Sequence, residues 1–354
     1  MLAAITTGPN VIEVAQRPEP SGPPSGHVLV HPEVVGICGS DFHIFTGDTV
    51  ALSGSERAYP RVQGHEFSAR VMAVGDGCPE ELAVGTRVAI WPLMACRECY
   101  PCQIGRSNVC VNFQLIGVHT DGGLQELLSV PYAQAFPAGD AAPQVVAFAE
   151  PMSVAVHAVR RGRVIAGERV VVLGAGPIGQ AVSLAAVDVG GRVMVVDPLA
   201  SRRHLALASG AEAAEWGTPE AVAAAARDWT GGAGPEVVLD TTGDARALGQ
   251  ALDMVVAAGR IVVVGMTGAE APVRSGLLPV KEVDVLGSSC CDAADFAEAV
   301  ALVRRTASAV ARLITDEFSL SDTSAAIARA MNQPQEVMKV TVSADDLDVS
   351  APKG

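Results

Sequence analysis

Between residues 148 and 287 the sequence repeats short runs rich in Val, Ile and Leu, each separated from the next by residues with helical periodicity. The runs lie at residues 169–173, 192–196, 236–239, 260–264 and 284–286. Strands that are apolar along their whole length are buried on both faces, and strands that alternate with helices form parallel sheets. This stretch is therefore predicted to be an α/β domain with helices on both faces of a parallel sheet.

The sequence on either side of the α/β stretch has a different pattern. Residues 1–147 contain short strand-like segments interrupted by many Gly and Pro residues, which predicts an irregular, mainly β region. Residues 288–354 are mixed, with an expected helix over 293–305 and a final strand over 336–342. The 354 residues are enough for about two domains.

A glycine-rich turn follows the first Val-rich run and precedes a helical stretch. Its candidate cofactor residues are Gly174, Gly176, Pro177, Ile178 and Gly179. In this context Gly174 allows a tight turn, Gly176 lets the backbone approach a pyrophosphate, and Gly179 lets helix and strand pack closely. Helix N-termini attract phosphate groups, so the turn predicts a dinucleotide site. The alternative is a glycine turn with a structural role only.

An acidic residue at the end of the next strand bears on the choice of dinucleotide. Asp197 follows the run 192–196. A carboxylate there accepts hydrogen bonds from the ribose hydroxyls and repels a 2′-phosphate, which favours NAD over NADP. Arg202 is also a candidate cofactor residue, and with Arg203 it could serve NADP instead; both arginines could equally lie on a solvated helix face.

Charge and hydropathy exclude several classes of partner. Against 25 Lys and Arg there are 39 Asp and Glu, a net charge of −14. Nucleic-acid and anionic membrane surfaces need clustered cations, so neither is expected as a partner. No apolar run is long enough for a membrane helix, and the first residues lack the pattern of a signal peptide. We therefore expect a cytoplasmic protein with a small-molecule substrate.

Four of the eight cysteines lie within 15 residues. Cys96, Cys99, Cys102 and Cys110 are separated by two, two and seven residues. This is ligand spacing, and four thiolates in one compact loop suit a closed, structural zinc site. An iron–sulfur cluster and four unrelated thiols are the alternatives. Cys78, Cys290 and Cys291 have no ligand spacing and receive no role.

Further metal-ligating residue types lie in three short motifs. Cys38, Ser40 and His43 occur together, His65 and Glu66 follow a glycine, and Glu150 precedes a proline at the start of the α/β stretch. Each residue alone is unremarkable. Beside a dinucleotide site, however, they form a candidate open zinc site, in which three protein ligands leave one position for substrate.

Five motifs follow one another along the chain: G-I-C-G-S-D-x-H, G-H-E, the four-cysteine loop, E-P and G-A-G-P-I-G. In this order they resemble the zinc-dependent medium-chain alcohol dehydrogenases, and the resemblance covers nearly the whole chain. The resemblance implies a doubly wound Rossmann sheet inserted into a mainly β, GroES-like catalytic domain. The catalytic domain would comprise residues 1–147 and 288–354, and the cofactor domain residues 148–287. It also implies a homodimer or homotetramer joined through the cofactor domain.

The resemblance implies one catalytic and one structural zinc. Cys38 and His65 would ligate the catalytic ion, with Glu150 as third ligand and Glu66 exchanging in. The Glu-Pro pair and the segments 59–61 and 116–123 resemble the polyol, sugar-acid and threonine dehydrogenase branch, with the segment before G-H-E making threonine the less favoured substrate. Ala69 and Thr86 depart from the family's usual Gly and Asp.

The implied reaction is hydride transfer from a secondary alcohol of a polyol, sugar or sugar acid to NAD. Ser40 would accept the hydroxyl proton and pass it through the cofactor ribose towards His43 and solvent, and Glu66 is counted with them as a catalytic candidate. Arg61 is a candidate partner for a substrate carboxylate, and residues 45–59 are expected to border the pocket. The alternatives are a dehydrogenase of simple or aromatic alcohols, a zinc-free quinone reductase, and a non-catalytic NAD-binding redox sensor.

Overall fold

The computed structural model describes residues 1–48 and 59–344. The chain divides into two compact units. The first contains residues up to Glu150 together with those from Val303 onward, and the second runs from Pro151 to Leu302. The segment expected to border the pocket, residues 45–59, lies largely outside the described residues.

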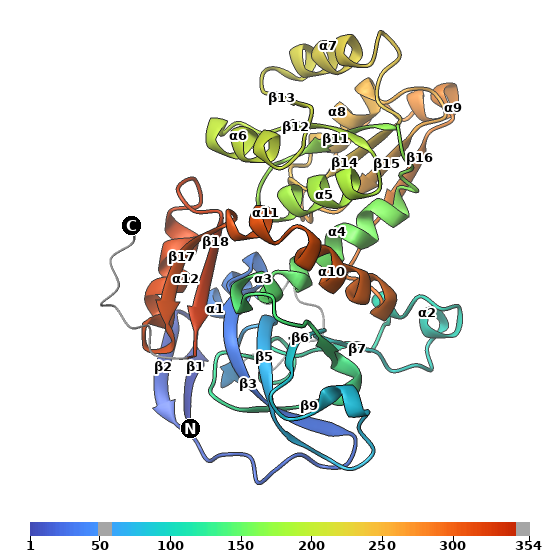
Figure 1. The fold of residues 1–354 in the computed structure, drawn as a ribbon. Helices are drawn as coiled ribbons and strands as arrows, with labels where there is room; N and C mark the ends of the chain where they lie inside the picture. The colour runs from blue at the N-terminus through green and yellow to red at the C-terminus, as the bar shows by residue number, and fades with distance from the viewer. Residues whose placement is uncertain (49–58, 345–354) are drawn as a thin grey trace. The chain divides into compact units, whose positions relative to one another are not determined.

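The second unit is built on a six-stranded sheet in the order β13-β12-β11-β14-β15-β16, and every pair in it is parallel (Figure 1). The strands are β11 (Arg169–Leu173), β12 (Arg192–Val196), β13 (Ala213–Glu215), β14 (Val237–Asp240), β15 (Arg260–Val263) and β16 (Asp284–Gly287). In chain order this is 3-2-1-4-5-6, the order of a doubly wound dinucleotide-binding fold. The predicted parallel α/β sheet is thus confirmed.

Both faces of this sheet are buried. Val170 and Val172 point to one face of β11, Val171 and Leu173 to the other, and all four are almost fully buried. The helices are α4 (Ala149–Arg161), α5 (Pro177–Asp188), α6 (Ala200–Ala208), α7 (Pro219–Trp229), α8 (Ala247–Met254), α9 (Leu277–Lys281) and α10 (Ala293–Arg305). The Ala-rich residues 221–226 form part of α7, whose N-cap Thr218 accepts a hydrogen bond from the Ala221 amide.

The first unit is centred on a seven-stranded sheet in the order β10-β6-β5-β3-β18-β17, with β9 also paired to β3. Its strands are β3 (His27–Gly36), β5 (Glu66–Val74), β6 (Arg87–Ile90), β9 (Leu128–Pro131), β10 (Ala135–Pro137), β17 (Ile314–Ser319) and β18 (Lys339–Ser343). β18, from the end of the chain, pairs with β3, from its beginning (Figure 1). The last strand is therefore part of the first sheet, and it begins three residues later than predicted.

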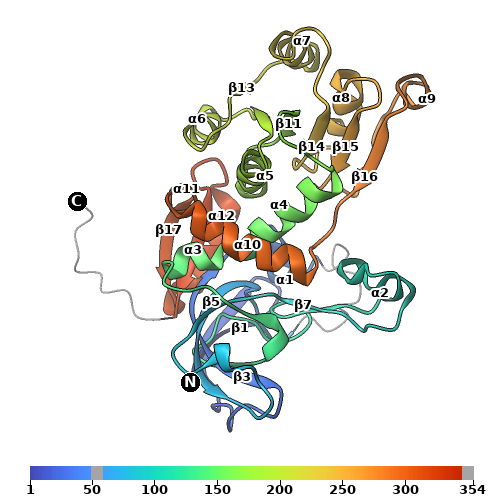
Figure 2. The same cartoon turned by 45° about the vertical axis from the view of Figure 1, so that its right-hand side comes forward.

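Among the described residues, two smaller sheets and five α-helices complete this unit. β1 (Leu2–Gly8), β2 (Val11–Gln16) and β4 (Arg61–Val62) form one small sheet, and β7 (Leu93–Met94) and β8 (Gln114–Leu115) form the other. The helices are α1 (Gly39–Thr46), α2 (Tyr100–Gln103), α3 (Pro143–Ala147), α11 (Ala307–Ala311) and α12 (Thr323–Asn332). Figure 2 shows the loop that carries α2 extending from β7.

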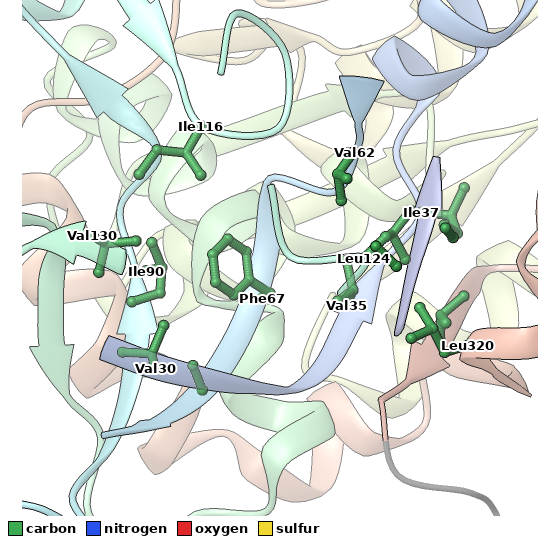
Figure 3. Close-up of a cluster of buried hydrophobic side chains, with 14 of the residues drawn as sticks. Val30, Val35, Ile37, Val62, Phe67, Ile90, Ile116, Leu124, Val130 and Leu320 are labelled. Atoms are coloured by element: carbon green, nitrogen blue, oxygen red, sulfur yellow. The ribbon is translucent and has the colours of Figure 1, made fainter. Parts of the chain in front are cut away.

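The core of the first unit surrounds Phe67, which is 1% exposed. Figure 3 shows its ring among buried aliphatic side chains such as Val30, Ile90 and Val130. Phe67 follows directly after His65 and Glu66. Its burial in this core therefore holds the backbone of these two residues in place at the start of β5.

The limits of the compact units differ from the predicted boundaries at residues 147 and 287. They fall inside α4 and α10, after Glu150 and after Leu302. The predicted boundary at residue 287 follows the strand pattern and therefore ends with β16. The second compact unit continues beyond it and includes most of α10. Among the described residues no helix is long and apolar enough to cross a membrane.

Candidate metal and dinucleotide sites

The four clustered cysteines converge in the loop around α2. The sulfurs of Cys96, Cys99, Cys102 and Cys110 all lie within 4.8 Å of one another. Cys110 Sγ is 3.3 Å from Cys96 Sγ and 3.7 Å from Cys99 Sγ. A tetrahedral zinc ion with bonds of about 2.3 Å places its sulfurs about 3.8 Å apart, so this spacing fits one ion.

Backbone amides lie close to some of these sulfurs, and the surroundings affect the charge of individual cysteines differently. Asn112 N–H and Cys96 N–H both point at Cys110 Sγ, at 3.4 and 3.3 Å. Hydrogen bonds from the backbone at Glu98 and Cys99 lower the pKa of Cys96 to about 6, whereas burial raises the pKa of Cys102 to about 12. In the described part of the chain, the cysteines form no disulfide. A single zinc ion therefore fits the donor set better than an iron–sulfur cluster, which distributes its thiolates over several irons.

A second group of ligand atoms lies in the same unit. Cys38, His65 and Glu66 bring a sulfur, a nitrogen and an oxygen within 4.8 Å of one another. Cys38 is the N-cap of α1, two residues after the end of β3, and Glu66 is the first residue of β5, with His65 directly before it. These positions meet because β3 and β5 are paired, with Gly36 opposite Glu66.

Asp41, one turn into α1, organises this group. One oxygen of its carboxylate accepts the Cys38 N–H at 2.9 Å, and the other is 3.6 Å from His65 Nδ1. The other ring nitrogen of His65 lies 3.3 Å from Ser40 Oγ. Burial by itself would lower the pKa of His65, but the Asp41 carboxylate and the Cys38 sulfur hold it well above its usual value. The surroundings thus favour a positive charge where a metal would bind.

Sequence reasoning missed Lys339, a buried cation beside this group. Lys339 is at the start of β18, is 5% exposed, and its ammonium forms an ion pair with Glu66 Oε2. Burial opposes its charge, but Glu66, Cys38 and Glu150 together raise the pKa of Lys339. A Cβ at Gly36 would be 2.4 Å from Glu66 Oε2, so a side chain there would displace the Glu66 carboxylate from its present position. The Lys339 ammonium thereby neutralises the charge of Glu66, one of the three candidate anionic ligands of the metal.

Glu150 faces the same charges but is not in the close group found among the described residues. It lies in the first turn of α4. Burial raises the pKa of Glu150 to about 7, an effect that His65 opposes and Glu66 reinforces. His43 lies elsewhere on α1, where its ring is 41% exposed and 3.5 Å from Asp48.

The segment 116–123 holds the backbone in front of His65. Amides of Gly122 and Gly123 donate to the carbonyls of Val62 and Gly64, both at 2.8 Å. A Cβ at Gly122 would be 2.3 Å from the Gly64 carbonyl oxygen, so the close approach requires glycine. Asp121 in the same segment accepts the Val62 N–H and lies 3.8 Å from the Arg61 guanidinium. Arg61, the candidate for a substrate carboxylate, therefore already has an acidic neighbour.

In the second unit the glycine turn joins β11 to α5 as predicted. Gly174 has φ +86°, and a Cβ at Gly179 would be 2.0 Å from the Gly174 carbonyl oxygen. A Cβ at Gly176 would meet only the Arg202 guanidinium, at 3.6 Å. Gly176 is the N-cap of α5, with Pro177 and Ile178 in its first turn. The backbone at Gly176 is thus open to a ligand, whereas Gly174 and Gly179 are required by the turn itself.

Asp197 is nearly buried at the end of β12. Its carboxylate accepts the N–H groups of Ala175 and Leu199, both at 2.8 Å, and lies 3.9 Å from the Arg202 guanidinium. Arg203 donates to the Asp197 carbonyl. Asp197 therefore ties the glycine turn to β12, a role that the ribose interpretation alone did not predict.

A doubly wound dinucleotide fold together with a closed four-cysteine site and a thiol, imidazole and carboxylate group defines a class of protein, the zinc-binding nucleotide-dependent oxidoreductases. Two family descriptions match the chain: an alcohol dehydrogenase GroES-like domain at residues 24–140 and a zinc-binding dehydrogenase at residues 177–305.

Relatives match over most of the chain. An uncharacterized zinc-type alcohol dehydrogenase-like protein of Haemophilus influenzae is 32% identical over 94% of this chain and 95% of its own. The L-galactonate-5-dehydrogenase of Escherichia coli is 32% identical over 91% and 93%. A 2-dehydro-3-deoxy-L-galactonate 5-dehydrogenase of Pseudoalteromonas atlantica is 35% identical over 88% and 90%. The chain belongs to the zinc-binding alcohol dehydrogenase family, which confirms the resemblance and the predicted enzyme class.

Solved structures give the same result. The RspB dehydrogenase of Escherichia coli with NADH has a TM-score of 0.87 and 30% identity, covering 97% of this chain and 99% of its own. A putative zinc-binding dehydrogenase of Sinorhizobium meliloti bound to NADP has a TM-score of 0.85 and 30% identity, covering 97% and 98%. The predicted Rossmann and GroES-like architecture is thereby confirmed. The oligomeric state and the cytoplasmic location remain predictions.

Proposed function

We propose that this protein oxidises a secondary alcohol of a polyol, sugar or sugar acid with NAD. The observation that carries the proposal is the buried group of Cys38, His65 and Glu66. It offers a thiol, an imidazole and a carboxylate in surroundings that favour positive charge. This donor set suits a zinc site with a position for substrate. The sugar-acid relatives support the substrate class.

The donor residues have distinct roles in this proposal. Cys38 and His65 hold the ion, and a carboxylate completes the set. Because Lys339 already engages one oxygen of Glu66, Glu150 is the favoured third ligand and Glu66 the exchanging one. A zinc ion held by these residues would supply a Lewis acid for the substrate hydroxyl, and a bound NAD would supply the hydride acceptor. Cys96, Cys99, Cys102 and Cys110 hold a separate, structural zinc.

Ser40 and His43 are the two residues of this chain that would handle the proton in this proposal. Ser40 Oγ lies 3.3 Å from His65 Nε2, beside the ligand atoms, and is placed to accept the hydroxyl proton. His43 is half exposed and paired with Asp48, so it can exchange a proton with solvent. The dinucleotide is held by the glycine-rich turn and two residues after β12: Gly174, Gly176, Pro177, Ile178, Gly179, Asp197 and Arg202.

A substrate panel tests the proposal. Polyols, sugar acids and simple or aromatic alcohols are each offered with NAD and with NADP, and reduced nicotinamide is followed by absorbance. Zinc is counted by mass spectrometry on the same sample. We expect the highest kcat/KM with a polyol or sugar acid and NAD, and about two zinc per chain. Turnover of simple or aromatic alcohols alone would show that the protein is a dehydrogenase of that substrate class instead. Binding of NAD without turnover of any alcohol would indicate a redox sensor.

A further inference from the structure

Three buried polar side chains behind His65 form a chain of hydrogen bonds that the proposed reaction does not use. Thr6 from β1 donates its hydroxyl to Gln63 Oε1 at 2.5 Å. Gln63 Nε2 donates to the Asp41 carbonyl at 2.9 Å and lies 3.4 Å from Asp41 Oδ1. Thr6 is 1% exposed, and Gln63 and Asp41 are 0% exposed. Burying three polar groups in a core is costly unless each is satisfied.

The direction of the Gln63 amide is determined by its partners. Both Asp41 atoms on its nitrogen side are acceptors, so only the NH₂ group can face them. The amide oxygen must then face Thr6, whose hydroxyl donates to it. The network therefore has one arrangement, and it holds Asp41 from the side opposite Cys38, whose N–H donates to Asp41 Oδ2.

Asp41 held in this way faces His65. The Oδ1 atom that Gln63 approaches is the one 3.6 Å from His65 Nδ1. A carboxylate that faces one ring nitrogen electrostatically favours the proton on that nitrogen and leaves the other nitrogen to bind metal. In this protein the nitrogen left to bind the metal is His65 Nε2, which lies near Ser40. The main chain of Gln63 is also fixed, because its carbonyl accepts the Leu124 N–H at 3.0 Å.

We propose that Gln63 is a positioning residue for the catalytic metal site: through Asp41 it sets the orientation and tautomer of His65, with Thr6 as its anchor in β1. The inference rests on the proposed role of His65 as a zinc ligand. Its competing explanation is a network that stabilises the fold without affecting the metal. The two differ in what happens to the metal when the amide is lost.

The main test replaces Gln63 with Met, which keeps the length of the side chain and removes its hydrogen bonds. Gln134→Met is the matched control, because Gln134 is also a buried amide of the first unit and donates to the Leu93 carbonyl at 3.2 Å. Urea unfolding reports stability for both variants. Zinc transfer to a chromogenic chelator and the visible spectrum of protein with cobalt at the catalytic site report on the metal.

We expect Gln63→Met to lose the catalytic zinc about tenfold more readily than the wild type and to shift the cobalt spectrum. Gln134→Met should lose stability but release zinc at the wild-type rate. The zinc of the four-cysteine loop is an internal reference and should be unchanged in both. Equal zinc release and equal spectra in the two variants would overturn the inference.

Thr6 provides a second route if Gln63→Met does not fold. Thr6→Val removes only the anchoring hydroxyl and should shift zinc release in the same direction but less, while Thr6→Ser should restore wild-type behaviour. No effect of Thr6→Val on either metal readout would argue against the network. A wild-type chain with only one zinc and no dehydrogenase activity would instead refute the proposed function, so the two failures are distinguishable.

Discussion

At the residue scale, the candidate catalytic site combines ligand atoms with groups that set their charge. Cys38, His65 and Glu66 bring donor atoms together, and Asp41 and Lys339 stand behind two of them. The donors are readable from sequence motifs. Asp41 belongs to the same motif as Cys38, but Lys339 is not readable in this way, because nothing in the residues around it indicates a buried cation.

Cys38→Ser should abolish dehydrogenase activity and remove one of about two zinc ions per chain, because a hydroxyl is a poorer zinc ligand than a thiolate. Zinc counting by mass spectrometry checks the result. Cys99→Ser is the complementary variant and should lose the other ion and thermal stability. Full activity with two zinc ions in Cys38→Ser would show that Cys38 is not a ligand.

Lys339→Met should destabilise the protein by about 3–5 kcal/mol, since it leaves Glu66 as a buried charge without its partner. Urea unfolding of the zinc-loaded protein measures the change. The double variant with Glu66→Gln should recover part of the loss, because the uncompensated carboxylate is then gone. A single variant as stable as the wild type would contradict the structural role given to the pair.

At the element scale, specific side chains join neighbouring strands. Glu33 on β3 forms ion pairs with Arg70 on β5 and Arg87 on β6, at 2.8 and 2.6 Å. These three strands lie next to one another in the sheet that carries the metal ligands. The network therefore links the part of the sheet that supports His65 and Glu66.

The Glu33 network makes stability depend on pH. Burial opposes ionisation of Glu33, but hydrogen bonds from Arg87 and Arg70 outweigh it and lower the pKa below its usual 4.5. A lowered pKa in the folded state means that the stabilisation is present above about pH 4.5 and is lost as pH falls through the folded-state value. Glu33→Gln should cost about 1–2 kcal/mol at pH 7 and progressively less in acid. Urea unfolding at several pH values tests this; a cost independent of pH would contradict it.

Substitutions at Gly176 and Gly179, which follow β11, should have different effects. Gly179→Ala should reduce stability strongly, because the new Cβ would overlap the Gly174 carbonyl oxygen. Gly176→Ala should leave stability nearly unchanged, because its Cβ meets only the Arg202 guanidinium at 3.6 Å, but should weaken NADH binding. Thermal unfolding and NADH fluorescence titration separate these effects. NADH binding by Gly176→Ala at wild-type affinity would exclude close approach of the cofactor there.

At the scale of the whole molecule, the two kinds of site lie in different compact units. All candidate metal ligands lie in the first unit, and the glycine turn, Asp197 and Arg202 lie in the second. Each unit has a buried core of its own. The metal and the dinucleotide therefore depend on separately built scaffolds.

Removal of zinc should accordingly abolish activity and lower the thermal stability of the first unit while NADH binding persists. We expect the Kd for NADH to change by less than about tenfold, which is about 1.4 kcal/mol. Chelation followed by calorimetry and NADH titration checks both parts, and readdition of zinc is the control for irreversible loss. Loss of NADH binding on chelation would show that the dinucleotide site depends on the metal-binding unit.

Much of the fold was predictable because its signals are local. The Val-rich strands of the second unit agree with the structure to within one residue at each end, since fully buried strands carry an uninterrupted apolar pattern. The helix predicted over 293–305 matches α10. The three-residue β13 and the strands β17 and β18 were missed or displaced. Short or partly exposed strands carry little pattern of their own and depend on the strand beside them.

The sequence by itself determined the four-cysteine loop and the glycine turn, because the residues involved lie within a few positions and their geometry is local. Only the tertiary structure decided what stands behind the candidate catalytic ligands. Lys339 reaches Glu66 because β18 pairs with β3 and β3 with β5, and Thr6 reaches Gln63 because β1 pairs with β4. Strand pairing between distant segments leaves no spacing pattern in the chain, so these neighbours appear only in the folded sheet.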